Sequence, residues 1–165
     1  MTQPFLDRRR LLGLVGLGGT ALVIGVSGDL GEAATPAPFK LSDAQWRARL
    51  TPAQYHVLRE EGTERAYTSP LNKEKRPGVF ACAGCGQPLF TSTTKFESGT
   101  GWPSFWAPIR GAVMTRSDRS LWMARTEVRC ARCAGHLGHV FDDGPKPTGK
   151  RYCMNGVAMV FRLKA

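Results

Sequence analysis

Four of the five cysteines in the chain form two pairs with the same spacing. Cys82 and Cys85 make the first pair, and Cys130 and Cys133 make the second. Because two intervening residues let a tight turn direct both sulfur atoms at one ion, two such pairs can supply the four thiolates of a closed, structural zinc site. Two disulfides or a redox-active pair are alternatives for the same residues. The repeated spacing favours one structural zinc ion per chain.

Cys153 lies outside the two pairs and is a candidate for a free, reactive thiol. If its segment is a β-strand, Asn155 points to the same face. The positive charge of Arg151 could lower the thiol pKa and increase the fraction of nucleophilic thiolate. A lone cysteine in an apolar strand is also commonly a buried core residue, and the segment by itself leaves both interpretations open.

Two further segments carry side chains suited to a reaction. His136 and His139 follow the second cysteine pair, and imidazole groups can position or protonate an oxygen that leaves a substrate. Either histidine could instead replace a cysteine as a metal ligand, although four cysteines already fill a tetrahedral site. Trp102 lies in a glycine-rich aromatic stretch, where its ring can hold a small methyl-bearing group or simply pack in the core.

The elements that must position these groups are predicted to be short helices followed by β-strands. Ser42 and Thr51 are predicted helix caps, and Pro52 with Gln54 strengthens the second helix start. Gly62 is the predicted helix stop. Beyond it, turn signals alternate with short apolar runs at residues 79–81, 121–124 and 152–163, a pattern typical of an antiparallel β domain.

The first 33 residues are predicted to be an export signal. Arg8, Arg9 and Arg10 precede an uncharged, glycine-containing run of 16 residues from Leu11 to Val26, and small and polar residues follow. The arginines resemble a bacterial twin-arginine signal, which implies a periplasmic protein with no stable membrane insertion after cleavage. An uncleaved anchor helix is the alternative. Residues 34–52 are interpreted as a linker and a first short helix, and residues 53–165 as the functional domain.

The formal net charge of +10 admits an anionic partner, but the basic residues are scattered along the chain. A basic zinc-ribbon module that binds nucleic acid would account for the charge and the cysteine pairs. It leaves Cys153 and the histidines without a role. The 44 residues between Cys85 and Cys130 also exceed the roughly 15–20 expected in a simple ribbon. We therefore expect no nucleic-acid partner.

Taken together, the segments resemble the methionine-R-sulfoxide reductase family, the B-type peptide methionine sulfoxide reductases. The resemblance runs from about Ala53 to Phe161. It rests on five stretches in order, namely residues 82–85, 98–105, 130–141, 143–149 and 151–155. Several separated motifs in one order are far more specific than any one of them.

The resemblance implies a mainly β fold of two antiparallel sheets with short N-terminal helices and a four-cysteine zinc site. It also implies that Cys153 is the nucleophile and that Trp102 packs against the substrate methyl group. His136, His139 and Asn155 match the polar side of the pocket, and Arg151 matches a residue thought to help hold the thiolate. The zinc ligands of metal-containing members match Cys82, Cys85, Cys130 and Cys133.

One departure from the family pattern concerns regeneration. Many members carry a second, resolving cysteine at the position of Thr100, and this chain has no other unpaired cysteine. We therefore expect a thiolate attack on the sulfoxide of oxidised proteins that leaves a sulfenic acid on Cys153. An external reductant, a thioredoxin-like protein or a small thiol, must then restore the enzyme, which would serve repair of oxidative damage.

Overall fold

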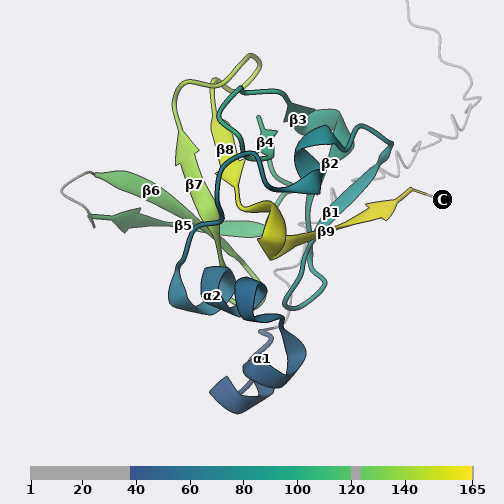
Figure 1. Cartoon of the computed structure of the whole chain (residues 1–165). Coiled ribbons are helices and arrows are strands. Elements are labelled where there is room, and N and C mark those ends of the chain that lie inside the picture. Colours follow the sequence, from purple (N-terminus) through teal and green to yellow (C-terminus); the bar gives the residue numbers. More distant parts are fainter. Residues whose placement is uncertain (1–37, 120–123, 165) are drawn as a thin grey trace, which may run out of the picture. The chain divides into compact units, whose positions relative to one another are not determined.

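The computed structural model describes residues 38–119 and 124–164. These residues fold into two antiparallel β-sheets with two short helices, as Figure 1 shows. The fold class predicted from the sequence is therefore confirmed. The predicted export signal and most of the predicted strand at 121–124 lie outside the described residues. Within the described residues, no helix is long and apolar enough to cross a membrane.

The two helices begin where the sequence predicts. Helix α1 spans Asp43–Arg49 and α2 spans Pro52–Glu60, and the side chains of Ser42 and Thr51 each close a capping box at the helix start. Helix α2 ends at Glu60, and the next residue, Glu61, adopts the left-handed conformation that stops it, so the stop lies one residue before the predicted Gly62.

The smaller sheet has three strands in the order β2-β1-β9. Strand β1 spans Gly78–Cys82, β2 spans Pro88–Thr91 and β9 spans Met159–Leu163. Short 3-10 helices η1, Pro70–Lys73, and η2, Ser92–Thr94, lie in the connections before β1 and after β2. The central strand β1 ends at the first cysteine pair, so this sheet fixes the position of one half of the cysteine cluster.

The larger sheet has six strands in the order β3-β4-β8-β7-β6-β5. Its strands span Lys95–Phe96 (β3), Ser104–Phe105 (β4), Val113–Asp118 (β5), Arg125–Cys130 (β6), His136–Phe141 (β7) and Arg151–Met154 (β8). The predicted single run from 152 to 163 is wrong. The 3-10 helix η4, Gly156–Ala158, divides it, so β8 joins the larger sheet and β9 joins the smaller one.

Three aromatic rings connect the two sheets through the core. Phe105 of β4 stacks on Phe90 of β2 with a centroid distance of 4.4 Å, and it meets Phe80 of β1 edge-on at 4.9 Å. All three side chains are fully buried. Ser104, the neighbour of Phe105, pairs with Cys153 of β8. The aromatic packing therefore also fixes the position of β8 relative to the smaller sheet.

Candidate active site and metal centre

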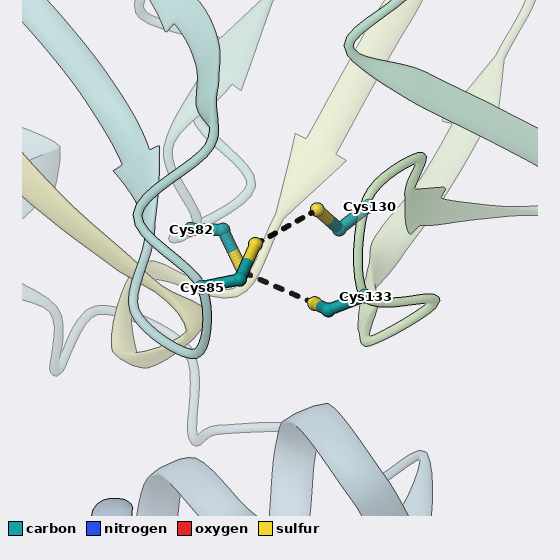
Figure 2. Close-up of side chains that lie close together, drawn as sticks. All are labelled: Cys82, Cys85, Cys130 and Cys133. Carbon is teal, nitrogen blue, oxygen red and sulfur yellow. Dashed lines mark hydrogen bonds between the residues drawn. The ribbon is translucent and has the colours of Figure 1, made fainter. Parts of the chain in front are cut away.

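The four paired cysteines form one buried cluster between the sheets. Figure 2 shows the two pairs facing each other, with the Sγ atoms of Cys82 and Cys133 3.7 Å apart and those of Cys85 and Cys130 3.6 Å apart. All four sulfur atoms lie within 4.8 Å of one another. Four ligands about 2.3 Å from a tetrahedral zinc ion would have sulfur atoms about 3.8 Å apart, so the cluster has the size and the donor chemistry of a metal site.

The two cysteine pairs sit on turns of the same construction. The amide of Gly86 donates to the carbonyl of Cys82, and the amide of Ala134 donates to the carbonyl of Cys130. Gly86 and Ala134 both adopt positive φ angles, 75° and 57°. Alanine rarely adopts this conformation because its Cβ approaches the following carbonyl. The second turn therefore keeps a backbone conformation that is unfavourable for Ala134. Such a conformation is expected where the positions of the cysteine sulfur atoms are constrained.

Arginine side chains hold the backbone of the two cysteine turns. Arg132 donates to the carbonyl of Cys85, and Arg59 of α2 donates to the carbonyl of Cys133. Arg49 of α1 donates to the carbonyl of Gly84. These bonds join both helices to the cluster and satisfy carbonyl groups that the tight turns leave without a strand partner.

Cys153 lies in the middle of the larger sheet and faces a small cavity of about 140 Å³. Its strand runs between β4 and β7, where Ser104 and His139 are its direct cross-strand neighbours. The cavity is lined by residues from five parts of the chain: Thr63, Trp102, Arg125, Gly138, His139, Phe141, Cys153 and Asn155. Four of the residues singled out by the sequence, Cys153, His139, Trp102 and Asn155, are thus brought together.

The cavity depends on a close approach of β7 to β8 at Gly138. A Cβ atom at this position would lie 2.1 Å from the carbonyl oxygen of Cys153, well inside van der Waals contact. The glycine also has a φ of 154°. Only glycine lets the two strands pack at this distance, so the Gly138 in the histidine segment is explained by the spacing of the site.

Opposing influences set the protonation of Cys153. Burial raises the pKa of its thiol above the ordinary value, while the Thr100 hydroxyl, 3.8 Å from the sulfur, and the charge of Arg151 oppose this shift. Arg151 therefore acts in the direction expected from the sequence, but burial outweighs it. The guanidinium of Arg151 is itself held by two hydrogen bonds to Asp143, each 2.8 Å long.

The two histidines occupy different environments. His139 lines the cavity, and its Nε2 lies 2.8 Å from a carboxylate oxygen of Asp118, which Arg125 also contacts. His136 is buried and is not among the residues that line the cavity. Its Nδ1 lies 2.7 Å from a Glu127 carboxylate oxygen, and its ring meets that of His139 edge-on at 5.4 Å.

Burial lowers the pKa of His136, although the Glu127 carboxylate opposes the shift. Among the described residues, its other ring nitrogen, Nε2, is buried without a hydrogen-bond partner. The structure therefore places His136 behind the cavity wall and His139 in the wall itself. The predicted role of His136 on the polar side of the pocket stays a prediction.

Trp102 and Asn155 are both fixed by polar contacts to the backbone. The Trp102 indole donates to the carbonyl of Glu64 at 3.1 Å. The side-chain Nδ2 of Asn155 donates to the carbonyl of Leu137 at 3.1 Å, and its Oδ1 accepts from the main-chain amide of Glu64 at 2.9 Å. These side chains cannot turn freely, so the cavity between them has a defined shape.

Sequence reasoning missed several residues that shape the site. Asp118 and Glu127 hold the histidines, and Thr63 and Arg125 line the cavity. The Asp118–His139 contact joins residues 21 positions apart, through the register of three strands. No local sequence pattern signals such a contact. The glycine between the histidines was the one local signal available for the close approach of β7 to β8.

Comparisons with known proteins identify the family. Residues 50–163 match the SelR domain. Over 121 residues the chain is 58% identical to the peptide methionine sulfoxide reductase MsrB of Agrobacterium fabrum strain C58, covering 73% of this chain and 90% of that protein. The chain belongs to the MsrB family of peptide methionine sulfoxide reductases.

Other MsrB relatives come from distant lineages. The peptide methionine sulfoxide reductase MsrB of Methanosarcina barkeri strain Fusaro is 57% identical over 124 residues, covering 74% of this chain and 87% of that protein. The chloroplastic peptide methionine sulfoxide reductase B1 of Arabidopsis thaliana is 57% identical over 120 residues, covering 72% of this chain and 59% of that protein. A solved structure, the Mis18 "Yippee-like" domain, aligns with 55% of this chain and 99% of its own at 19% identity and a TM-score of 0.45.

The raised pKa of Cys153 predicts how its alkylation by iodoacetamide depends on pH. Only the thiolate reacts, and burial holds the pKa above the ordinary value, so the rate should rise about tenfold per pH unit from pH 7 to 8.5. Mass spectrometry of the Cys153 peptide measures the rate. Replacing Arg151 by Met should slow alkylation at each pH, because the positive charge that lowers the pKa is removed. A plateau near pH 7 in the unaltered protein would contradict the prediction.

Proposed function

We propose that the chain reduces methionine-R-sulfoxide in oxidised proteins to methionine, with Cys153 as the nucleophile. The observation that carries the proposal is the placement of the Cys153 sulfur in a cavity with an ionisable histidine, an indole ring and a fixed amide. Membership of the MsrB family supports the same reaction. The preference for the R epimer follows from the family resemblance, and the asymmetric cavity gives it a physical basis.

The reaction begins when the Cys153 sulfur attacks the sulfoxide sulfur. His139 is the better placed of the two histidines to protonate the sulfoxide oxygen, because it lines the cavity and is the cross-strand neighbour of Cys153. The Asp118 carboxylate lies 2.8 Å from its Nε2, so this contact fixes the orientation of the ring beside Cys153. In the net step one oxygen passes from the substrate to Cys153, which becomes a sulfenic acid while the sulfoxide becomes methionine.

The remaining cavity residues hold the substrate. The Trp102 ring provides an apolar face for the methyl group on the sulfoxide sulfur. Asn155 fixes the wall beside Cys153, and the charge of Arg151 supports the thiolate against the cost of burial. His136 acts from behind, where its edge contact limits the movement of the His139 ring.

Regeneration requires an external thiol in this chain. Thr100 occupies the position next to the Cys153 sulfur where a resolving cysteine would stand, and the remaining four cysteines are together in the buried cluster. A small thiol or a thioredoxin-like protein would attack the sulfenic acid, release water and form a mixed disulfide. A second thiol then reduces that disulfide and frees Cys153.

The cysteine cluster is proposed to hold one structural zinc ion per chain. Four buried thiolates leave no coordination position for water or substrate, so the ion would stabilise the fold and take no part in the reaction. The residues that would bind it are Cys82, Cys85, Cys130 and Cys133.

The arginine-containing N-terminus supports export to the bacterial periplasm by the twin-arginine route. Arg8, Arg9 and Arg10 precede an apolar, uncharged run followed by small residues. That route carries folded proteins, so a zinc ion could be bound in the reducing cytoplasm before the domain reaches an oxidising compartment. The proposed location is consistent with repair of proteins exposed to oxidants.

Replacing Cys153 by Ser should abolish the reduction of methionine-R-sulfoxide peptides, because a hydroxyl is a far weaker nucleophile than a thiolate. The unaltered domain should reduce R-sulfoxide peptides and leave S-sulfoxide peptides unchanged, as chromatography of the products can measure. The variant should retain its metal and its melting temperature, since Cys153 is outside the cluster. Activity within tenfold of the unaltered chain would overturn the mechanism.

Replacing Cys82 by Ser should release zinc and lower the free energy of unfolding by several kcal/mol, because metal binding is coupled to folding. Elemental analysis should give about one zinc ion per unaltered chain and much less in the variant. The Cys153→Ser protein is the matched control, since it loses a cysteine that is not in the cluster. Full zinc content and an unchanged melting temperature in Cys82→Ser would show that the cluster is not the zinc site.

A single turnover without reductant should give one methionine per chain and a sulfenic acid on Cys153 that a dimedone reagent traps. Replacing Thr100 by Cys should convert this product into an internal disulfide, because position 100 is next to the Cys153 sulfur. A cysteine at Thr115 on β5, three strand spacings or about 14 Å from β8, is the control that should not pair. Loss of two hydrogens with zinc release in the unaltered chain would instead identify a cluster cysteine as the resolving thiol.

A further inference from the structure

Glu64 makes hydrogen bonds to two residues of the cavity wall and to the turn that follows Asn155. It lies in the segment between α2 and η1, next to Thr63, which lines the Cys153 cavity. Its main-chain amide donates to Asn155, and its main-chain carbonyl accepts from the Trp102 indole. All of these contacts join residues that are far apart in the sequence.

The carboxylate of Glu64 fixes the same segment to the turn that follows the reactive strand. One oxygen accepts from the amide of Gly156, and the other accepts from the amide of Val157 at 2.9 Å. These two amides begin η4, immediately after Asn155. Charge-assisted bonds of this kind are stronger than neutral ones, so they hold the segment although the side chain is only partly buried.

We propose that Glu64 is a positioning residue for substrate recognition, which acts by holding Trp102 and Asn155 at their places in the cavity wall. Its carboxylate fixes the backbone at position 64, and that backbone in turn fixes the indole and the amide. Cys153 and His139 are held independently by β8 and β7. The proposal rests on the proposed function, in which Trp102 holds the substrate methyl group.

The expected effect is therefore on substrate binding and not on the reactivity of the thiol. Burial raises the pKa of Glu64 and the amides of Gly156 and Val157 oppose the shift, as expected for a carboxylate that has exchanged water for these two donors. Removing the carboxylate leaves two amides without an acceptor and releases the segment. The Trp102 ring then loses its fixed orientation, while the sulfur of Cys153 keeps its surroundings.

The test compares the Glu64→Ala and Glu64→Gln variants with the unaltered protein, all as the full chain, in the reduction of a methionine-R-sulfoxide peptide. In Glu64→Ala the KM should rise on the order of tenfold while kcat changes less than threefold, because positioning of the substrate is impaired. Glu64→Gln keeps the size of the side chain and one acceptor oxygen, so its KM should lie between that of the unaltered chain and that of Glu64→Ala. If Glu64→Ala does not fold, the Gln variant carries the test.

Two controls separate positioning from a general loss of stability. Glu74→Gln removes a carboxylate that also accepts from a backbone amide, but Glu74 does not line the Cys153 cavity, so its KM should be unchanged. The rate of Cys153 alkylation by iodoacetamide should agree within twofold in all variants. The indole NMR resonance of Trp102, assigned by a Trp102→Phe variant, should shift in the Glu64 variants and not in Glu74→Gln.

An unchanged KM, or a fall in kcat alone, in the Glu64 variants would overturn the proposal. An unshifted Trp102 resonance would do the same. Neither result would affect the proposed function, which fails only if the unaltered chain does not reduce the peptide. The two failures are therefore distinguished by the activity of the unaltered protein.

Discussion

The contact among four sulfur atoms is the constraint on which the two-sheet arrangement depends. Cys82 ends the central strand of the smaller sheet, and Cys130 ends a strand of the larger one. Their pairs face each other in the buried space between the sheets, and arginines from both helices bind the turns that carry them. Strand β7, which carries His136 and His139, follows the second turn directly, so the cluster also sets where this strand begins.

The cavity shows how burial and charge are balanced around a thiol. Burial in the cavity strengthens polar interactions around the sulfur, but it also raises the pKa of Cys153. Thr100 and Arg151 oppose that effect without removing it. Because the thiolate is the form that oxidants attack, a raised pKa lowers the fraction of Cys153 that is open to adventitious oxidation.

The segment between α2 and η1 completes the site from outside the sheets. Glu64 binds it to the turn after β8, and Tyr67 adds bonds to the backbone of Gly99 and Gly101. In the proposed mechanism the larger sheet supplies the reacting groups, Cys153 on β8 and His139 on β7. The segment and the glycine-rich stretch supply the opposite wall of the cavity. Hydrogen bonds between residues 32 to 93 positions apart join the segment to the glycine-rich stretch and to the turn after β8.

The sequence alone determined the helix starts, the β class, the cysteine pairs and the set of residues that includes Cys153, His139, Trp102 and Asn155. These features are local, because caps, turns and paired cysteines carry their signal within a few residues. Only the tertiary structure decided that residues 152–163 divide between two sheets, and that His139 lies in the cavity wall while His136 lies behind it. The roles of Asp118, Glu127 and Glu64 were hidden for the same reason. Each depends on hydrogen bonds between segments that meet only when strand register, burial and the close approach at Gly138 are fixed together.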